Sequence, residues 1–261
     1  ATPSSGTAID LSWTAISGSP TYSIYSSSDN ITFTQLATGV SGNTYQHTGL
    51  NLGQTVYYKY SVTNAGGESA QSLSASATTY DVPNSPTGLT LTHPTPTSAR
   101  LTWVAPSDNG GDPNISYTLQ RSTDGINWTS HLGTQNTIID DTNLVQGTQY
   151  YWRVNAVNSA GIGSVSNTVT YTVPNAPTSP TGLTAALVGS TNSAGTLNWG
   201  APTNTSGYNV IGYQIERNED GNGWVTIVAD TGNSNLAFTN TGLVSGSSYV
   251  YRVSAITAVG I

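Results

Sequence analysis

Side chains that could carry out chemistry are few and scattered in this sequence. Its 261 residues include three histidines, no cysteine and no methionine, which excludes disulfides, thiolate metal sites and thiol nucleophiles. His47, His93 and His131 stand in unrelated local contexts, and none lies beside a serine in a hydrolase pattern. We expect all three to be surface residues. The sequence therefore predicts no catalytic residue and no cofactor.

Two short acidic stretches could supply oxygen ligands to a cation. Asp108, Asn109 and Asp112 fall in one loop, and Asp140 is followed directly by Asp141. Neither stretch has the spacing of a dedicated calcium loop, and both aspartate and asparagine readily form turns. We expect turn chemistry at both places and no bound metal.

The charge composition excludes several classes of partner. Charged residues make up 7% of the chain, and the net charge of −7 includes only six lysines and arginines. Without a basic surface to neutralise phosphates, nucleic-acid binding is not expected. No apolar run is long enough to cross a bilayer, so we expect no membrane insertion. A chain without cysteine or methionine that is acidic and rich in Ser, Thr and Asn is typical of an extracellular or cell-surface protein.

The elements that must position any site occur three times along the chain. Each copy opens on a Leu-x-Trp motif, then has a hairpin turn with Asp29, Asp124 or Asp220, and later a Leu followed by a glycine and a Tyr-rich run. The repeat length is 90 to 99 residues, which is the size of a domain. Apolar residues alternate with polar ones, as in Tyr150, Trp152 and Val154, which predicts half-buried antiparallel strands. We therefore expect an all-β chain of three sandwiches, each with seven strands.

The opening Pro-Thr-Gly-Leu-Thr, the Pro106 to Gly111 loop and the Asn-Ser-Ala-Gly ending resemble fibronectin type III domains. The resemblance implies tandem immunoglobulin-like sandwiches at residues 1–80, 81–173 and 174–261. It also implies a tyrosine corner at Tyr150 and Tyr249. In the first copy this position is Val56, so we expect that domain to diverge most. The expected core residues are Trp13, Trp103, Trp199, Leu50, Leu144, Leu243, Tyr150 and Tyr249.

Two proline-rich segments, beginning at Val82 and Val173, lie where one sandwich should end and the next begin. Because proline fixes φ and extends the residue before it, these linkers predict a semi-rigid rod. Only twelve residues precede Trp13, so the first domain should lack strand A, and the third should lack strand G. An unpaired strand edge is a template for another strand. The chain is then either a window of a longer array or a subunit that accepts a strand from its neighbour.

Three aromatic residues at equivalent positions after the hairpin turns, Phe33, Trp128 and Trp224, could stack on a polysaccharide. The alternative is that they cover the edge of each core, and we favour it because large aromatic side chains in strands mostly pack. Four glycosylation sequons, Asn30, Asn114, Asn127 and Asn204, fall in expected loops or turns.

These observations favour a non-catalytic extracellular array that serves as a spacer, stalk or filament subunit. Its expected partners are copies of itself or further domains of the same chain, and polysaccharide is a further candidate. One alternative is an accessory segment of a secreted polysaccharide-degrading enzyme. Another is an adhesin or receptor that binds protein through the loops near 109–114 and 203–209. The sandwich fold does not decide between them, because it hosts many functions.

Overall fold

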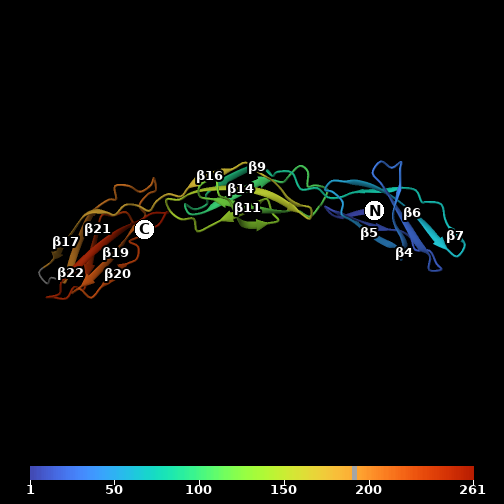
Figure 1. Ribbon diagram of the computed structural model, residues 1–261. Helices are drawn as coiled ribbons and strands as arrows, with labels where there is room; N and C mark the ends of the chain where they lie inside the picture. The colour runs from blue at the N-terminus through green and yellow to red at the C-terminus, as the bar shows by residue number, and fades with distance from the viewer. Residues whose placement is uncertain (190–192) are drawn as a thin grey trace.

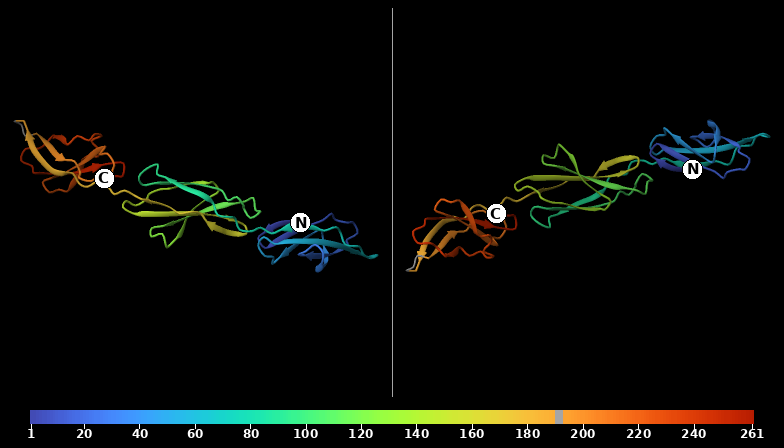
Figure 2. Two further views of the ribbon diagram at one scale, coloured as in Figure 1. Left: turned by 90° about the horizontal axis from the view of Figure 1, so that it is seen from above. Right: turned by 90° about the horizontal axis from the view of Figure 1, so that it is seen from below.

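The computed structural model describes residues 1–189 and 193–261, and this part of the chain contains strands, turns and loops but no helix. In consequence it also has no helix that could span a membrane. Three β-sandwiches follow one another in a row and give an elongated molecule (Figure 1), and two further views show narrow joints between them (Figure 2). The all-β tandem architecture expected from the sequence is confirmed.

The first sandwich packs the sheet β1-β2-β5 against the sheet β4-β3-β6-β7, with β8 also paired to β6. All its strand pairs are antiparallel. In this sandwich the last strand of the larger sheet is split in two, so that β7 and β8 lie along the same edge of β6. Its strands are β1 (Thr2–Ser5), β2 (Ala8–Ser12), β3 (Thr21–Ser27), β4 (Thr34–Ser41), β5 (Thr44–Thr48), β6 (Thr55–Asn64), β7 (Gly67–Glu68) and β8 (Ala75–Thr78).

The middle sandwich repeats this arrangement. The sheet β9-β10-β13 faces the sheet β12-β11-β14-β15, with β16 also paired to β14. Its strands are β9 (Thr87–Thr92), β10 (Ala99–Val104), β11 (Ser116–Ser122), β12 (Thr129–Thr134), β13 (Ile138–Asp141), β14 (Gln149–Asn158), β15 (Gly161–Val165) and β16 (Val169–Thr172). The predicted limits at residues 80 and 173 fall in the segments that precede β9 and follow β16.

The third sandwich has two three-stranded sheets, β17-β18-β21 and β20-β19-β22. As in the other two, the strand that carries the Leu-x-Trp motif is the central strand of the first sheet. Its strands are β17 (Thr181–Val188), β18 (Ala194–Gly200), β19 (Gly212–Glu219), β20 (Trp224–Val228), β21 (Ala237–Thr241) and β22 (Tyr249–Ile256).

A tryptophan lies between the sheets of every sandwich, and its ring meets a tyrosine of the opposite sheet. Trp103 meets Tyr117 at 5.3 Å between ring centroids, and Trp199 meets Tyr213 at 5.1 Å. Both of these indoles are buried, whereas Trp13 is only partly buried. The expected core leucines, Leu50, Leu144 and Leu243, are buried, as is Tyr150, while Tyr249 is half-buried.

The structure corrects one expectation about the ends of the array. The first sandwich does have a first strand, because β1 pairs with β2 across a tight turn at Gly6 and Thr7. Twelve residues before Trp13 are enough for two short strands, and Pro3 is tolerated because β1 lies at a sheet edge. In the third sandwich no strand follows β22 within the described residues; only an isolated bridge joins Thr257 to Gly260.

Candidate functional site

Two of the histidines contact a tyrosine ring. His47 is half-buried, and its Nδ1 lies 2.9 Å from the hydroxyl oxygen of Tyr58. Burial lowers the pKa of His47, so the imidazole favours its neutral form. His93 is exposed and stacks on Tyr171 with 4.8 Å between ring centroids. His47 thus has a structural contact inside the first sandwich, and the expectation of a surface residue was wrong for it.

Asp141 is one of two buried aspartates in the middle sandwich, the other being Asp112. It is only 2% exposed, and its carboxylate accepts a hydrogen bond from Trp152 Nε1 at 2.8 Å. His131 Nε2 lies 2.9 Å from the same carboxylate, and Arg121 donates to it at 3.2 Å. Burying an ionised carboxylate is unfavourable unless it is paired and hydrogen-bonded, and these three partners offset the loss of hydration. The turn role expected for Asp141 is therefore wrong: it ends strand β13 and joins the two sheets.

In all three sandwiches the residue at the position of Asp141 forms a hydrogen bond between the two sheets, although the residue type differs. Strand register makes it equivalent to His47 on β5 and Asn240 on β21. Each of these side chains reaches the polar atom of an aromatic residue in the opposite sheet. The three inter-sheet pairs are His47–Tyr58 at 2.9 Å, Asp141–Trp152 at 2.8 Å and Asn240–Tyr251 at 2.8 Å. A buried tyrosine or tryptophan usually finds a hydrogen-bond partner for its polar atom, and these pairs provide one, whereas the buried ring nitrogens of the core residues Trp13, Trp103 and Trp199 have none.

The remaining acidic groups of the candidate metal sites stabilise loops or pair with a cation. Asp140 forms a two-bond ion pair with Arg100, each bond 2.8 Å long. Asp112 is buried, which opposes its ionisation, yet hydrogen bonds from Ser159 and Asn114 outweigh burial and lower its pKa. Within residues 1–189 and 193–261, no group of three or more Asp, Glu or His side chains is placed to hold a metal ion.

Each candidate glycan-binding aromatic residue lies in or just before β4, β12 or β20, beneath a cation from the strand two places away in the same sheet, β6, β14 or β22. A cation over an aromatic ring is attracted by the negative charge of the ring face. Phe33 and Trp128 are half-buried, while Trp224 is 41% exposed. The cation-to-centroid distances are 4.2 Å for Lys59–Phe33, 4.1 Å for Arg153–Trp128 and 4.5 Å for Arg252–Trp224.

In the middle and third sandwiches a third residue continues the stack across the sheet. Arg153 donates to Gln120 Oε1 at 2.7 Å, and the two residues lie directly opposite in the β11–β14 register. Arg252 and Glu216 hold the same positions in the third sandwich and form a two-bond ion pair, which lowers the pKa of Glu216. One face of each ring is therefore occupied by the protein itself, which favours a packing role over sugar stacking.

The tyrosine corners lie where the sequence indicates. The Tyr150 hydroxyl accepts a hydrogen bond from the main chain of Val145 at 3.2 Å, and that of Tyr249 accepts one from Val244 at 2.8 Å. In the first sandwich Val56 replaces the tyrosine and is buried. There the side chain of Gln54 accepts the equivalent bond, from the main-chain N–H of Asn51 at 2.8 Å.

All four sequon asparagines are exposed and lie outside the strands. The side-chain nitrogen of Asn127, where a glycan would attach, donates to Asp124 at 2.7 Å, and that of Asn114 donates to Asp112 at 3.3 Å. Asn30 has a positive φ of 58° in its hairpin turn. Asn204 accepts a bond from the main-chain N–H of Ser206 at 2.8 Å.

The joint between the first and middle sandwiches is held by direct contacts. The main-chain N–H of Asp81 donates to the carbonyl oxygen of Gly110 at 2.8 Å, and Asn158 donates back to the carbonyl oxygen of Asp81 at 2.7 Å. A β-carbon added to Gly6 would lie 2.5 Å from Leu52 Cδ2 and 2.8 Å from Ala160 Cβ, so the two sandwiches meet closely here. On the other side the main-chain N–H of Tyr80 donates to the carbonyl oxygen of Ser5 at 3.2 Å, so the linker contacts both sandwiches.

The joint between the middle and third sandwiches involves equivalent positions, but the contact is made by hydrogen bonds. Gln146 is equivalent to Leu52, and its Nε2 donates to the carbonyl oxygen of Val259 at 2.7 Å. Its Oε1 accepts from the main-chain N–H of Ala176 in the linker at 3.2 Å. Val259 in turn is equivalent to Ala160, since each precedes the glycine after the long central strand. At both joints, therefore, the loop before the long strand of one sandwich meets the turn after the equivalent strand of the next sandwich.

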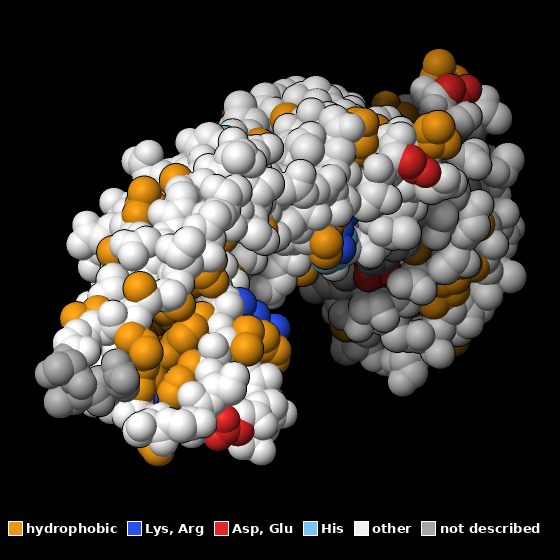
Figure 3. All heavy atoms as spheres, turned by 90° about the vertical axis from the view of Figure 1, so that its left-hand side faces the viewer, with side chains coloured by type: hydrophobic (Ala, Val, Ile, Leu, Met, Phe, Trp, Pro, Cys, Tyr) orange, Lys and Arg blue, Asp and Glu red, His pale blue; other side chains and the backbone are white. Residues whose placement is uncertain are grey.

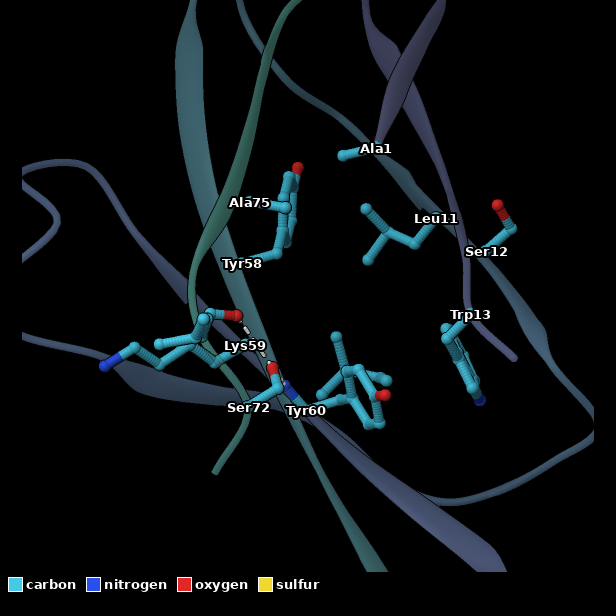
Figure 4. A pocket seen from close by; sticks show the side chains of 11 residues that line it. Ala1, Leu11, Ser12, Trp13, Tyr58, Lys59, Tyr60, Ser72 and Ala75 are labelled. Atoms are coloured by element: carbon cyan, nitrogen blue, oxygen red, sulfur yellow. Dashed lines mark hydrogen bonds between the residues drawn. The ribbon is translucent and has the colours of Figure 1, made fainter. Parts of the chain in front are cut away.

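The first sandwich also has a small open cavity between its sheets (Figure 4), with a volume of about 80 Å³. Leu11, Trp13 and Tyr58 line it, and Leu73 stands at its rim with 94% of its surface exposed. In the middle sandwich the residue equivalent to Leu73 is Asn167, which binds both the N–H and the carbonyl oxygen of Leu89. In the middle sandwich the place equivalent to this cavity is filled by the beginning of strand β9.

Comparison with known proteins identifies the family. The fibronectin type III domain model matches residues 84–172 and 178–261, so the chain belongs to this family. Residues 1–83 are outside both matches, in line with the expectation that the first copy diverges most.

The relatives include structural proteins and an enzyme. Human Myomesin-2 is 30% identical over 82% of this chain and 15% of its own length. Exoglucanase B of Cellulomonas fimi is 29% identical over 96% of this chain and 23% of its own length. The chain thus spans less than a quarter of these relatives. Among solved structures, the FN1–FN3 domains of chicken CNTN1 align over 98% of this chain and 91% of theirs, with 20% identity and a TM-score of 0.34.

Sequence reasoning missed the inter-sheet pairs and the stacked cations. The signal for the stacks was present, because Lys59, Arg153 and Arg252 recur at one position of the long central strand. The inter-sheet pairs gave no such signal, since His, Asp and Asn share no obvious pattern. Their common role shows only when strand register brings the positions together.

Proposed function

We propose that this chain is a non-catalytic spacer within an extracellular or cell-surface protein, and that it sets a fixed distance between the parts on either side of it. The observation that carries the proposal is the construction of the two joints. Gly6 lies close against Ala160 of the middle sandwich, Gln146 binds Val259 of the third, and Asn158 binds the first linker. A flexible tether would need no such contacts.

The arrangement of polar groups supports the same proposal. Asp141, His131 and Arg121 come together, but they do so around the indole of Trp152 inside the sandwich. Asp112 stabilises a loop through Ser159. These groups are used for folding, whereas catalysis needs groups directed at a substrate in a cleft.

An accessory role in a polysaccharide-degrading enzyme is the second candidate, favoured by the similarity to Exoglucanase B over 96% of this chain. Both candidates assign the chain a spacing role, and they differ in what it separates. The adhesin alternative has less support, because the loop near 109–114 takes part in the first joint through Gly110.

Electron microscopy of the purified chain, together with hydrolysis assays on glycan and ester panels, tests the proposal. We expect straight particles of three beads and no turnover. Strongly bent or collapsed particles, or hydrolysis that persists through repurification, would contradict it.

A further inference from the structure

Another hollow of the first sandwich opens to the surface at the end of strand β3. Its volume is about 360 Å³, and Ser26, His47 and Val56 line it together with the hairpin turn that contains Asp29. All of its lining residues lie within or between strands β3 and β6. The hollow is therefore part of the body of this sandwich and involves neither end of the chain.

The other two sandwiches fill the equivalent place with an arginine side chain. In the middle sandwich the guanidinium carbon of Arg121 lies 5.2 Å from the ring centroid of Tyr150. In the third sandwich the guanidinium carbon of Arg217 lies 5.1 Å from the ring centroid of Tyr249. Each guanidinium also has a carboxylate partner, at 3.2 Å in both cases. A cation and an aromatic ring thus occupy this corner of the sandwich together.

In the first sandwich smaller residues replace both members of that pair. Ser26 stands at the position of the arginine, because it lies opposite Tyr58 in the β3–β6 register. Arg121 lies opposite Trp152 in the same way in the β11–β14 register. Val56 stands at the position of the corner tyrosine and is buried. The hollow is therefore the space that an arginine and a tyrosine fill elsewhere in this chain, and Val56 gives it an apolar wall.

The polar lining of the hollow includes an ionised carboxylate. Asp29 Oδ1 accepts hydrogen bonds from the main-chain N–H groups of Ile31 and Thr32, at 2.8 and 2.9 Å, and these bonds lower the pKa of Asp29 to about 2. The equivalent carboxylate of the middle sandwich, Asp124, also accepts a bond at its Oδ2, from the side chain of Asn127. Thr32 replaces that asparagine, and within residues 1–189 and 193–261 Asp29 Oδ2 has no partner.

No cation lies beside this carboxylate. The lining of the hollow contains neither lysine nor arginine, and Lys59 lies over the ring of Phe33 instead. His47 favours its neutral form, because burial lowers its pKa. Charged side chains are few and isolated over the face of the molecule that Figure 3 shows. Asp29 therefore sets the electrostatic potential at the hollow, which favours a positively charged occupant.

We propose that this hollow binds the arginine side chain of a partner polypeptide, with its guanidinium at Asp29 and its methylene groups against Val56. A guanidinium presents a fork of N–H donors that matches carboxylate and hydroxyl oxygens. The methylene stem of an arginine packs well on an apolar wall. The occupant then takes the place that Arg121 and Arg217 take in the other two sandwiches. This binding role is additional to the spacer function and does not depend on it.

The probe is N-acetylarginine amide, which carries the side chain on a single peptide unit. It is titrated into the isotope-labelled 261-residue chain, and the amide chemical shifts are followed by nuclear magnetic resonance. We expect saturable shifts confined to the turn of Asp29 and the neighbourhood of His47, which weaken as salt is added. N-acetylcitrulline amide has the same shape without the charge and should bind about tenfold more weakly.

Two variants of the hollow and one control locate the site. Asp29→Asn keeps the Oδ1 acceptor of the turn but removes the charge, and it should abolish binding. Asp124→Asn makes the same change in the middle sandwich, where Arg121 fills the place, and should leave binding unchanged. Ser26→Arg combined with Val56→Tyr fills the hollow as in the other two sandwiches. The double variant should fold and should not bind the probe.

Equal binding of the arginine and citrulline compounds would overturn the proposal, as would the absence of saturable shifts. Binding that persists in Asp29→Asn or in the filled double variant would place the probe elsewhere. Equal losses in Asp29→Asn and Asp124→Asn would also contradict the proposal, because binding would then depend on the net charge of the chain and not on the hollow.

Discussion

The side-chain amide of Asn158 donates a hydrogen bond to the carbonyl oxygen of Asp81 at 2.7 Å, so a residue of the middle sandwich binds the linker that leads into it. The same nitrogen lies 2.9 Å from the carbonyl oxygen of Asn109. One amide thus joins the linker, the loop before β11 and the turn after β14. This contact converts a proline-rich connection, which is only semi-rigid by itself, into a fixed joint.

The close approach at Gly6 predicts that a larger side chain will open the first joint. Gly6→Val introduces atoms where Leu52 and Ala160 already are. The methyl end of Leu52 can move, but Ala160 can move only with the turn that carries it. We expect small-angle scattering to show a broader range of molecular dimensions with little change in unfolding temperature.

Gly133→Ala is the matched control for Gly6→Val, because its β-carbon would meet its nearest atom at an ordinary 3.7 Å. It should leave the scattering unchanged. Identical scattering from the Gly6→Val variant and the native chain would show that the joint does not depend on this contact.

Removing the buried carboxylate of the middle sandwich should destabilise it strongly. Asp141→Ala leaves the indole N–H of Trp152 and the guanidinium of Arg121 without their shared acceptor. The expected loss is about 3–5 kcal/mol, as for other buried ion pairs that lose one partner. Chemical denaturation followed by tryptophan fluorescence measures it.

Asp140→Ala removes the neighbouring carboxylate, whose ion pair with Arg100 is nearly half exposed. It should cost less than about 1 kcal/mol. Similar losses for Asp140→Ala and Asp141→Ala would contradict the role assigned to the buried cluster.

Removing the hydroxyl of the tyrosine corner should destabilise the middle sandwich less than removing the Asp141 carboxylate. Tyr150→Phe keeps the ring but removes the acceptor for the Val145 N–H, which should cost about 1 kcal/mol. Tyr151→Phe, one residue along on the opposite face of β14, should change unfolding by much less. If the two substitutions have equal effects, the corner hydrogen bond makes no net contribution.

The stacked aromatic residues predict a loss of stability without a loss of sugar binding. Trp128→Ala removes the ring beneath Arg153, and the stack and its packing are together worth about 1–2 kcal/mol. Polysaccharide pull-down with the native chain and this variant should give the same background. Specific retention of the native chain that Trp128→Ala abolishes would instead support a glycan site.

His47 predicts a pH dependence of the first sandwich. Burial lowers its pKa below the ordinary 6.5, so the unfolded chain binds a proton more readily than the folded one. The stabilisation is fully present above about pH 6.5 and is lost as the pH falls below it. Thermal unfolding of the native chain should weaken more between pH 8 and pH 5 than unfolding of His47→Gln. Parallel pH profiles would exclude a contribution from His47.

The architecture could be predicted from sequence because it depends on local and repeated signals. Alternation in Tyr150, Trp152 and Val154 fixes which face of a strand is buried, and the equivalent run beginning at Tyr249 repeats it. The short strand β1 was missed because four residues that include Pro3 give little alternation to detect. The pairing of Asp141 with Trp152 could not be predicted, since it depends on the distance between two sheets.

The central claim is that the joints are stiff, and the distance between two labels across the first joint tests it most directly. Because the native chain has no cysteine, Gln35→Cys on β4 and Ser130→Cys on β12 place one spin label on each sandwich at equivalent exposed positions. Pulsed electron spin resonance should give a single narrow distance distribution, which broadens when Asn158→Ala is added. A broad distribution in the labelled chain with Asn158 intact would contradict the account.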